Sequence, residues 1–185
     1  MQSVVMFLLL QLTPIALDRL APPCVELGKL ASSPSQNQAL SARIALGRCV
    51  VEQEVKKIAL CDCEQAVDQI NEVLDPTLAM LDEVFGAGDP ATQILARHAQ
   101  GDLLASLATR MLATVPAPTD SSESAAQLHE TRLRMLRPMI EPWLARAHSA
   151  FEDVDRLARA NPQVTKNPAV AAAVQASRQQ GVAKR

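Results

Sequence analysis

The chain has 185 residues, which is enough for one domain with a sizeable core. It holds no Tyr, one Trp and three Phe, and Ala, Leu and Val supply most of its apolar side chains, a composition that favours packed helices over a sheet. The formal net charge is −2 and charges of both signs are interspersed, so no global basic field attracts nucleic acid and we expect no nucleic-acid partner.

Residues 4–12, VVMFLLLQL, form a short apolar run that only Gln11 interrupts. The run is too short to span a bilayer comfortably, but its length matches the core of a secretion signal. No Lys or Arg precedes it, and the following TPIALDRLAPPC offers poor cleavage sites. Three interpretations of residues 1–20 stay open: a signal peptide, an uncleaved anchor, and a buried first helix. We expect a periplasmic or secreted protein that contacts the membrane only through this segment.

Residues 21–35 are rich in Pro and polar side chains and are expected to form a linker. Ser35 and Gln38 then fit a capping box at the start of a helix that extends to about residue 57. The sequence predicts a single helical domain over residues 36–180, followed by a basic tail over residues 181–185 that frays. The apolar face of the first helix comprises Leu40, Ile44, Val51 and Val55.

A second helix is expected to begin at Asp62, because Asp62 and Gln65 fit another capping box. Pro76 lies within this helix and is expected to kink or split it, since proline removes a backbone hydrogen bond and clashes with the preceding turn. The apolar residues keep helical spacing to about residue 85 and comprise Val67, Ile70, Leu74, Leu78, Leu81 and Phe85.

A third helix is predicted over residues 90–114, with Asp89 as its cap and Pro90 at its first position. The stretch VPAPTDSS then forms a loop, because two prolines break the pattern. Asp120 and Glu123 are suited to capping the helix that follows this loop.

The fourth helix shows its clearest apolar spacing over residues 140–158, and Pro138 and Pro142 predict a kink or a short break before it. Asn167 and Pro168 start a last, short helix. The expected fold is therefore all-α, with two antiparallel helical hairpins plus a short C-terminal helix, either as an irregular bundle or in a repeat-like arrangement.

Two stretches within residues 90–162 resemble tetratricopeptide-type helical hairpins. ARHAQGDLLASLA places Gly101 and Leu104 near the small and bulky positions of the first helix of such a unit, and ARAHSAFEDV places Ala147 and Phe151 at the Ala-x-x-x-Phe spacing of the second. No 34-residue repeat is visible. The chain is also similar to exported bacterial helical proteins of unassigned role. These resemblances imply a scaffold for protein interactions.

The four cysteines, Cys24, Cys49, Cys61 and Cys63, allow disulfides, reduced core thiols or a metal site. Zinc knuckles and thioredoxin-like motifs need two residues between cysteines, whereas an even count behind an export signal favours disulfides. In one unbroken helix Cys49 and Cys61 would lie about 18 Å apart, so a bridge between them requires a turn. A direct Cys61–Cys63 bond would be strained. We therefore expect two bridges, each joining Cys24 or Cys49 to Cys61 or Cys63.

No catalytic or metal-binding set is complete in the sequence. HETRL begins at His129 like the zinc-protease signature, but Leu133 stands where the second histidine ligand is needed. His98 and His148 fit partly exposed helix positions. The acidic stretches lack the spacing of a calcium loop, and no Gly-x-Ser-x-Gly elbow occurs. We expect no catalytic residue, no metal, no cofactor and no enzymatic activity.

RLRMLR places Arg132, Arg134 and Arg137 close together, and Met135 and Met139 lie beside them. A solvated face with salt bridges is the simpler interpretation of the arginines, and core packing is the simpler interpretation of the methionines. The same residues also suit an exposed surface for a protein partner or an anionic group, because methionine adapts well to different partners.

These observations favour a non-catalytic exported helical protein that acts as a protein–protein interaction module in the bacterial cell envelope, with a protein partner that the sequence does not identify. The alternative is a helical bundle that binds a small apolar ligand or a metal between its helices. A cavity lined by Met and Leu, with a convergent polar group, would favour the alternative. A filled core with an apolar or charged outer surface would favour the interaction module.

Overall fold

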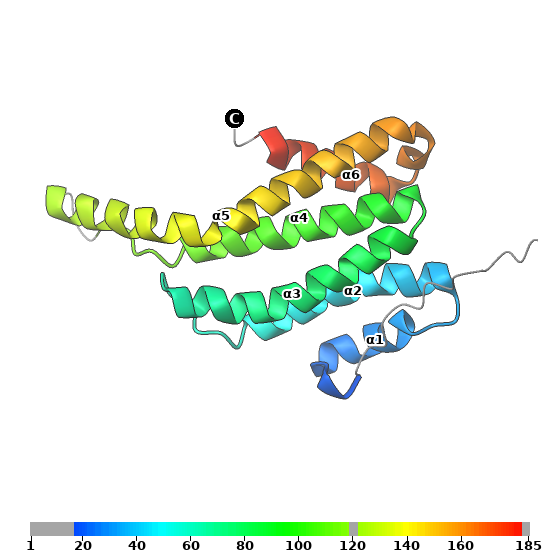
Figure 1. Ribbon diagram of the computed structural model, residues 1–185, viewed down its shortest axis with the longest axis horizontal. Helices are drawn as coiled ribbons and strands as arrows, with labels where there is room; N and C mark the ends of the chain where they lie inside the picture. Colours follow the sequence, from blue (N-terminus) through cyan, green and yellow to red (C-terminus); the bar gives the residue numbers. More distant parts are fainter. Residues whose placement is uncertain (1–16, 119–121, 183–185) are drawn as a thin grey trace, which may run out of the picture.

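The computed structural model describes residues 17–118 and 122–182, and all regular structure in these residues is helical (Figure 1). The all-α class predicted from the sequence is confirmed. Three short 3-10 helices are η1 (Leu17–Arg19), η2 (Pro22–Cys24) and η3 (Pro162–Lys166). The α-helices are α1 (Val25–Ala31), α2 (Gln36–Val55), α3 (Glu64–Ala87), α4 (Pro90–Leu112), α5 (Glu123–Ala160) and α6 (Pro168–Val182).

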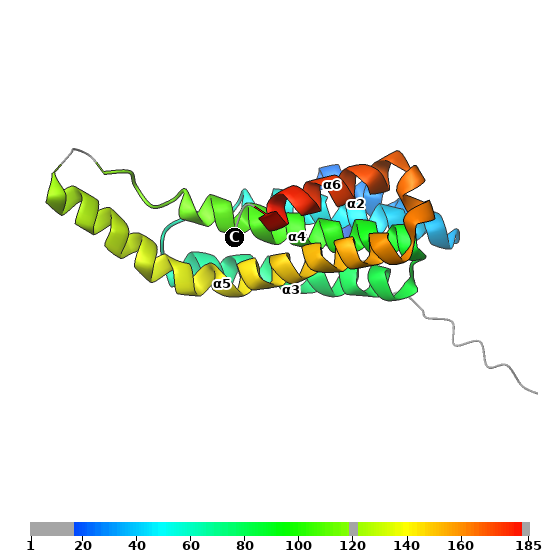
Figure 2. The ribbon, with the colours of Figure 1, turned by 90° about the horizontal axis from the view of Figure 1, so that it is seen from above.

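The long helices pack as two hairpins, α2 with α3 and α4 with α5, which lie along one another in both views (Figures 1 and 2). After α5 the chain turns through η3, and α6 packs against α4 and α5. Within the described residues, no helix combines the length and apolarity that crossing a membrane requires. The predicted export signal falls on residues 1–16, outside the described residues, apart from its last few positions in η1.

The main core lies between α2, α3, α4 and α5, and apolar side chains from all four helices fill it. Trp143 is 5% exposed, and its Nε1 donates a 2.8 Å hydrogen bond to Oδ1 of Asn71, so its one polar atom is satisfied. A Cβ atom built on Gly101 would lie 2.5 Å from the Phe151 ring, so only glycine lets α4 approach α5 this closely. The largest buried side chains of this core are Ile70, Leu74, Leu104, Leu107, Met111, Leu136 and Ile140.

Two predicted helix starts are confirmed and two capping boxes are wrong. Asp89 accepts a 2.8 Å hydrogen bond from the Thr92 backbone N–H, and Asn167 Oδ1 accepts one from Ala169. The Ser35 side chain makes no capping bond, although the helix does begin beside it.

Asp62 does not cap α3, because the helix begins at Glu64 and Cys63 is its N-cap. The Asp62 carboxylate instead forms a 3.6 Å ion pair with Arg132 of α5. Ser122 caps α5 by accepting a hydrogen bond from Ala125, whereas the predicted cap Asp120 lies outside the described residues.

The three internal prolines do not divide their helices. Pro76 lies inside α3, and Pro138 and Pro142 lie inside the 38-residue α5. All three prolines are exposed. Each proline lacks the N–H that would donate to the carbonyl four residues earlier, and these carbonyls belong to Glu72, Arg134 and Pro138. Because these residues are also exposed, water can replace the lost hydrogen bonds. α5 nevertheless bends in its yellow part in both views, as the prediction of a kink requires (Figures 1 and 2).

Residues 21–35 are not the linker that their composition predicts. They contain η2 and α1, and α1 packs against α2. Cys24 and Ala31 are buried there in a separate cluster with Ala42 and Leu46 of α2. The helical body therefore begins before residue 36. At the other end α6 continues to Val182, and the remainder of the predicted basic tail, residues 183–185, lies outside the described residues.

Candidate interaction surface

The four cysteines form two disulfides, but the predicted pairing is wrong. Cys24 is joined to Cys49 with their Cα atoms 5.8 Å apart, and Cys61 is joined to Cys63 with their Cα atoms 5.2 Å apart. No bridge connects the first pair to the second. The formation of disulfides, as opposed to free thiols or a metal site at these four residues, agrees with the expectation from the sequence.

The pairing follows from the two faces of α2. Cys49 lies on the face that packs against η2 and α1, in the cluster that contains Cys24. Cys61 and Cys63 pack at the edge of the main core, on the other side of the helix. A bridge from Cys49 to Cys61 or Cys63 would require the Cys49 side chain to point toward the main core. Its position on α2 directs it to the other face of the helix, so this bridge cannot form.

The N-terminal part of α5, residues 123–135, projects beyond the end of the bundle in both views (Figures 1 and 2). We call these residues the α5 arm. None of their side chains is buried, and Leu136 is the first buried residue of α5. Leu128 is 58% exposed and Met135 is 63% exposed. The arm thus presents two large apolar side chains to solvent, seven residues and about two helical turns apart, on one side of the helix.

The predicted surface residues divide between this arm and the core edge. Arg132 is half-buried and pairs with Asp62, whereas Arg134 and Arg137 are exposed and form no ion pair within residues 17–118 and 122–182. Met135 is exposed. Met139 is partly buried against the main core, so the core interpretation holds for Met139 and the surface interpretation for Met135.

Leu128 is a member of this surface that the sequence did not single out. It lies seven residues before Met135, a spacing of about two helical turns that was visible in the sequence. His129 Nδ1 of the arm lies 2.7 Å from the Pro116 carbonyl oxygen, and this contact ties the α4–α5 loop to the helix. The arm is therefore a positioned element with a defined apolar side.

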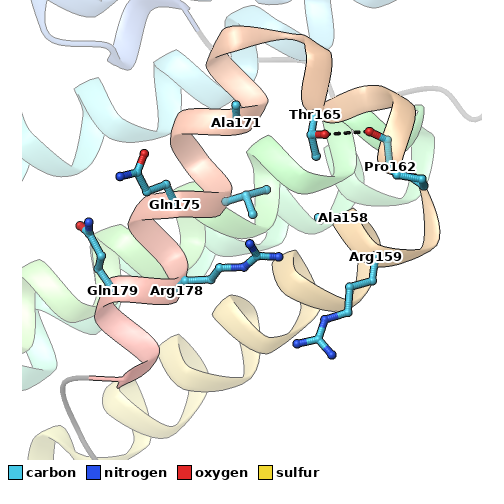
Figure 3. A pocket seen from close by; sticks show the side chains of 9 residues that line it. Ala158, Arg159, Pro162, Thr165, Ala171, Gln175, Arg178 and Gln179 are labelled. Carbon is cyan, nitrogen blue, oxygen red and sulfur yellow. Dashed lines mark hydrogen bonds between the residues drawn. The ribbon is translucent and has the colours of Figure 1, made fainter.

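Besides a hollow of about 580 Å³ that His148, Glu152 and Ser177 line, three hollows border α5 elsewhere. One, of about 530 Å³, lies between α5, η3 and α6, where Arg159 and Arg178 approach it from opposite sides (Figure 3). Arg178 Nε donates a 2.8 Å hydrogen bond to Asp155, and Arg159 also pairs with Asp155. The hydrogen bond from Arg178, with the positive charges of both arginines, holds the pKa of the Asp155 carboxyl below its usual value. The Asp155 carboxylate thus offsets one of the two positive charges at this hollow.

The second hollow, of about 370 Å³, is lined by Leu144, Phe151 and Gln180, and the buried Oε1 atom of Gln180 has no hydrogen-bond partner among residues 17–118 and 122–182. The third, of about 230 Å³, lies between α3 and α5 beside Trp143 and Met139. Both are open to solvent on one side, and the main core beneath them is filled by side chains.

His98 and Ser177 form a histidine–serine pair that the sequence did not predict. His98 Nδ1 and Ser177 Oγ share a 3.1 Å hydrogen bond between α4 and α6. Ser177 is only 1% exposed, and the bond joins α6 to α4. Burial lowers the pKa of His98, the charge of Arg48 lowers it further, and Asp102 opposes both.

Within the described ranges, no three His, Cys, Asp or Glu side chains are arranged to hold a metal ion. His129 contacts a backbone carbonyl and His148 pairs with Glu152 on the same helix. No protein-family model matches the sequence, and comparisons with curated proteins and with solved structures gave no match. The resemblance to tetratricopeptide hairpins therefore stays a prediction.

Proposed function

We propose that this protein is a non-catalytic interaction module of the bacterial cell envelope and that it binds a protein partner through the α5 arm. The observation that carries the proposal is the exposure of Leu128 and Met135. Among the residues that the structure describes, only these two and Leu30 are exposed large apolar side chains, and the first two share the arm.

The arm has the properties of a helix that docks into a groove. Its two exposed large apolar side chains lie on one side, and Arg134 adds an exposed charge that suits an acidic rim on the partner. A helix of about a dozen residues gains little stability without packing, so a partner that covers it adds burial that the chain itself does not provide. Each apolar side chain covered in this way contributes about 1.5–3 kcal/mol before the cost of association is counted.

The compartment is supported by the disulfides. Structural disulfides persist where the surroundings are oxidising, as in the periplasm or outside the cell. The Cys24–Cys49 bridge joins η2 to α2 and thereby ties the residues before the bundle to its body. Export through the segment at residues 1–20 remains part of the proposal.

A second candidate function, the binding of a small apolar ligand, is favoured by one observation. Gln180 Oε1 is a buried acceptor to which no described residue donates, at a hollow lined by Leu144 and Phe151. A ligand with an apolar body and one hydrogen-bond donor would satisfy it. Titration with apolar probes, followed by fluorescence of the single tryptophan and by thermal stabilisation, tests this function. Stabilisation that Gln180→Leu abolishes would favour it over the interaction module.

Photo-crosslinking in cells of the source organism tests the main proposal. A photoreactive residue in place of Leu128 or Met135 is expected to give one discrete adduct with a protein, and Arg134→Glu in the same chain should weaken it. The matched control is the same residue in place of Leu30, which is exposed on α1, at the opposite part of the molecule. Equal adduct patterns from positions 30 and 128, or no adduct from the arm, would contradict the proposal.

A further inference from the structure

We propose that the Cys61–Cys63 disulfide is a thiol–disulfide exchange site, whose substrates are thiols and disulfides of partner proteins or small molecules. This inference departs from the non-catalytic part of the proposed function, and it does not depend on the interaction with a partner through the α5 arm. It arises from the pairing of Cys61 with Cys63. Because these two partly exposed cysteines bridge each other, their bond can open and close without a change in any other covalent bond of the chain.

The two disulfides differ in their surroundings. Cys24 is fully buried and Cys49 is partly buried beside an apolar cluster, so an attacking thiolate can approach this bridge only from the Cys49 side. Cys61 and Cys63 are both partly exposed, in the connection between α2 and α3. That connection lies at the same end of the bundle as the α5 arm, since Asp62 pairs with Arg132 of the arm.

The ring that Cys61–Cys63 closes is short, because only Asp62 lies between the cysteines. A bridge across one residue restricts the unfolded chain far less than the 25-residue span between Cys24 and Cys49. The fold therefore depends little on this bond. The helices on both sides hold the two cysteines together after the bond opens, so the dithiol and disulfide forms share one folded structure.

The helix that follows favours a thiolate at Cys63. Cys63 is the N-cap of α3, a helix of 24 residues, and unpaired backbone N–H groups with the positive end of the helix dipole stabilise negative charge there. The neighbouring carboxylate of Asp62 would oppose this, but Arg132 partly neutralises it at 3.6 Å. Cys63 is thus the better leaving group and, once reduced, the more reactive nucleophile.

The exchange balances in two steps. A substrate thiolate attacks Cys61 Sγ, the Cys61–Cys63 bond breaks, and Cys63 leaves as a thiolate, so that a mixed disulfide joins Cys61 to the substrate. A second substrate thiolate then attacks the substrate sulfur of the mixed disulfide, releases the Cys61 thiolate and forms the oxidised substrate. Two substrate thiols lose two electrons, which reduce one protein disulfide to two thiols. The reverse sequence oxidises Cys61 and Cys63 at the expense of a substrate disulfide.

The first test equilibrates the native, full-length protein with glutathione redox buffers and maps free thiols by mass spectrometry after acid quenching. We expect Cys61 and Cys63 to become alkylated together at millimolar reduced glutathione while Cys24–Cys49 stays closed and the helical circular dichroism is unchanged. If Cys61–Cys63 stays closed under conditions that open Cys24–Cys49, or if its opening unfolds the protein, the proposal is overturned.

The second test compares Cys61→Ser, which leaves Cys63 as the free thiol, with Cys63→Ser, which leaves Cys61. Both variants retain Cys24–Cys49, and circular dichroism verifies that they fold. At neutral pH we expect iodoacetamide to react with Cys63 about fivefold or more faster than with Cys61, because the N-terminus of α3 stabilises the Cys63 thiolate. A purely structural bridge predicts no such difference, so equal rates in two folded variants would overturn the assignment.

Discussion

At the scale of single residues, the contact between Gly101 and Phe151 sets how closely α4 and α5 approach. Gly101 is buried in the middle of α4, where glycine is unfavourable for a helix by about 1 kcal/mol. The close approach of the aromatic ring explains its presence, because any Cβ atom would overlap the ring. A helix-breaking residue is thus retained for packing.

Gly101→Ala is expected to lower the melting temperature. Overpacking against a rigid ring costs about 1–3 kcal/mol, which outweighs the gain of about 1 kcal/mol in helix propensity. Gly86→Ala in α3 is the matched control, since nothing lies within 4 Å of its added Cβ, and it should leave stability unchanged or raise it. Thermal unfolding followed by circular dichroism measures both. A Gly101→Ala variant as stable as the wild type would show that the helices separate without cost.

At the scale of elements, one part of α5 carries the exposed side chains that we propose bind a partner, and the following part stabilises the core. Leu128 and Met135 touch solvent, while the next residue, Leu136, is 1% exposed in the main core. Adjacent positions on one helix therefore have different roles, because Leu136 lies on the face of α5 that packs against the core and Met135 does not.

Leu128→Ser with Met135→Ser should leave the free energy of unfolding within about 0.5 kcal/mol of the wild type, since exposed substitutions rarely do more. Leu136→Ala should lower it by about 2–5 kcal/mol, because it leaves a cavity in the core. Urea unfolding measures both changes, and adduct formation from a photoreactive residue at position 132 reports partner binding. A double-serine variant that unfolds as readily as Leu136→Ala would mean that the arm is packed in solution.

The attachment of α6 is a second element with a testable response, here to pH. Val170, Ala173 and Val174 bury one side of α6 against α4 and α5, and the His98–Ser177 hydrogen bond lies beside them. The pKa of His98 in the folded protein is below its ordinary value of 6.5, mainly because of burial. The unfolded chain therefore binds the proton more readily, so stability is fully present above this value and is lost as the pH falls through it.

We expect the urea midpoint to fall between about pH 8 and about pH 5 by more in the wild type than in His98→Gln, which keeps a polar side chain but cannot titrate. Other groups contribute equally to both proteins, so the difference isolates His98. An identical fall in the two proteins would show that His98 is protonated as easily in the folded state as in the unfolded chain.

At the scale of the whole molecule, the two disulfides contribute unequally. The Cys24–Cys49 bridge closes a span of 25 residues, for which the chain-entropy relation gives about 3.5 kcal/mol. The same relation gives about 1.5 kcal/mol for Cys61–Cys63. The first bridge therefore accounts for most of the covalent stabilisation and fixes η2 and α1 on the bundle.

Non-reducing peptide mapping is expected to find Cys24 with Cys49 and Cys61 with Cys63. Cys24→Ser with Cys49→Ser should reduce the free energy of unfolding by about twice as much as Cys61→Ser with Cys63→Ser. Chemical denaturation of the two double variants measures this ratio. A peptide that joins Cys24 or Cys49 to residues 61–63 would contradict the structure.

The sequence by itself determined what depends on neighbours within a few residues. The helical spacing of apolar residues predicted the α2–α3 and α4–α5 hairpins and the last helix, because each pattern defines one buried face. Asp89 and Asn167 were predicted as helix starts because a cap bonds to backbone two or three positions away. The arginine and methionine stretch was recognised as a possible surface for the same local reason.

Only the tertiary structure decided the features that depend on distant contacts. The partner of each cysteine follows from which face of α2 meets α1, and Asp62 gives up its predicted capping role for Arg132, which lies 70 residues later. Pro76, Pro138 and Pro142 are tolerated because their helices place them toward solvent. The exposure of Leu128 and Met135 follows from which side of α5 the bundle covers, since Leu133 and Leu136 of the same helix pack against the core. Burial is a property of all the surrounding elements together, so spacing along one helix cannot fix which of its apolar residues the rest of the protein covers.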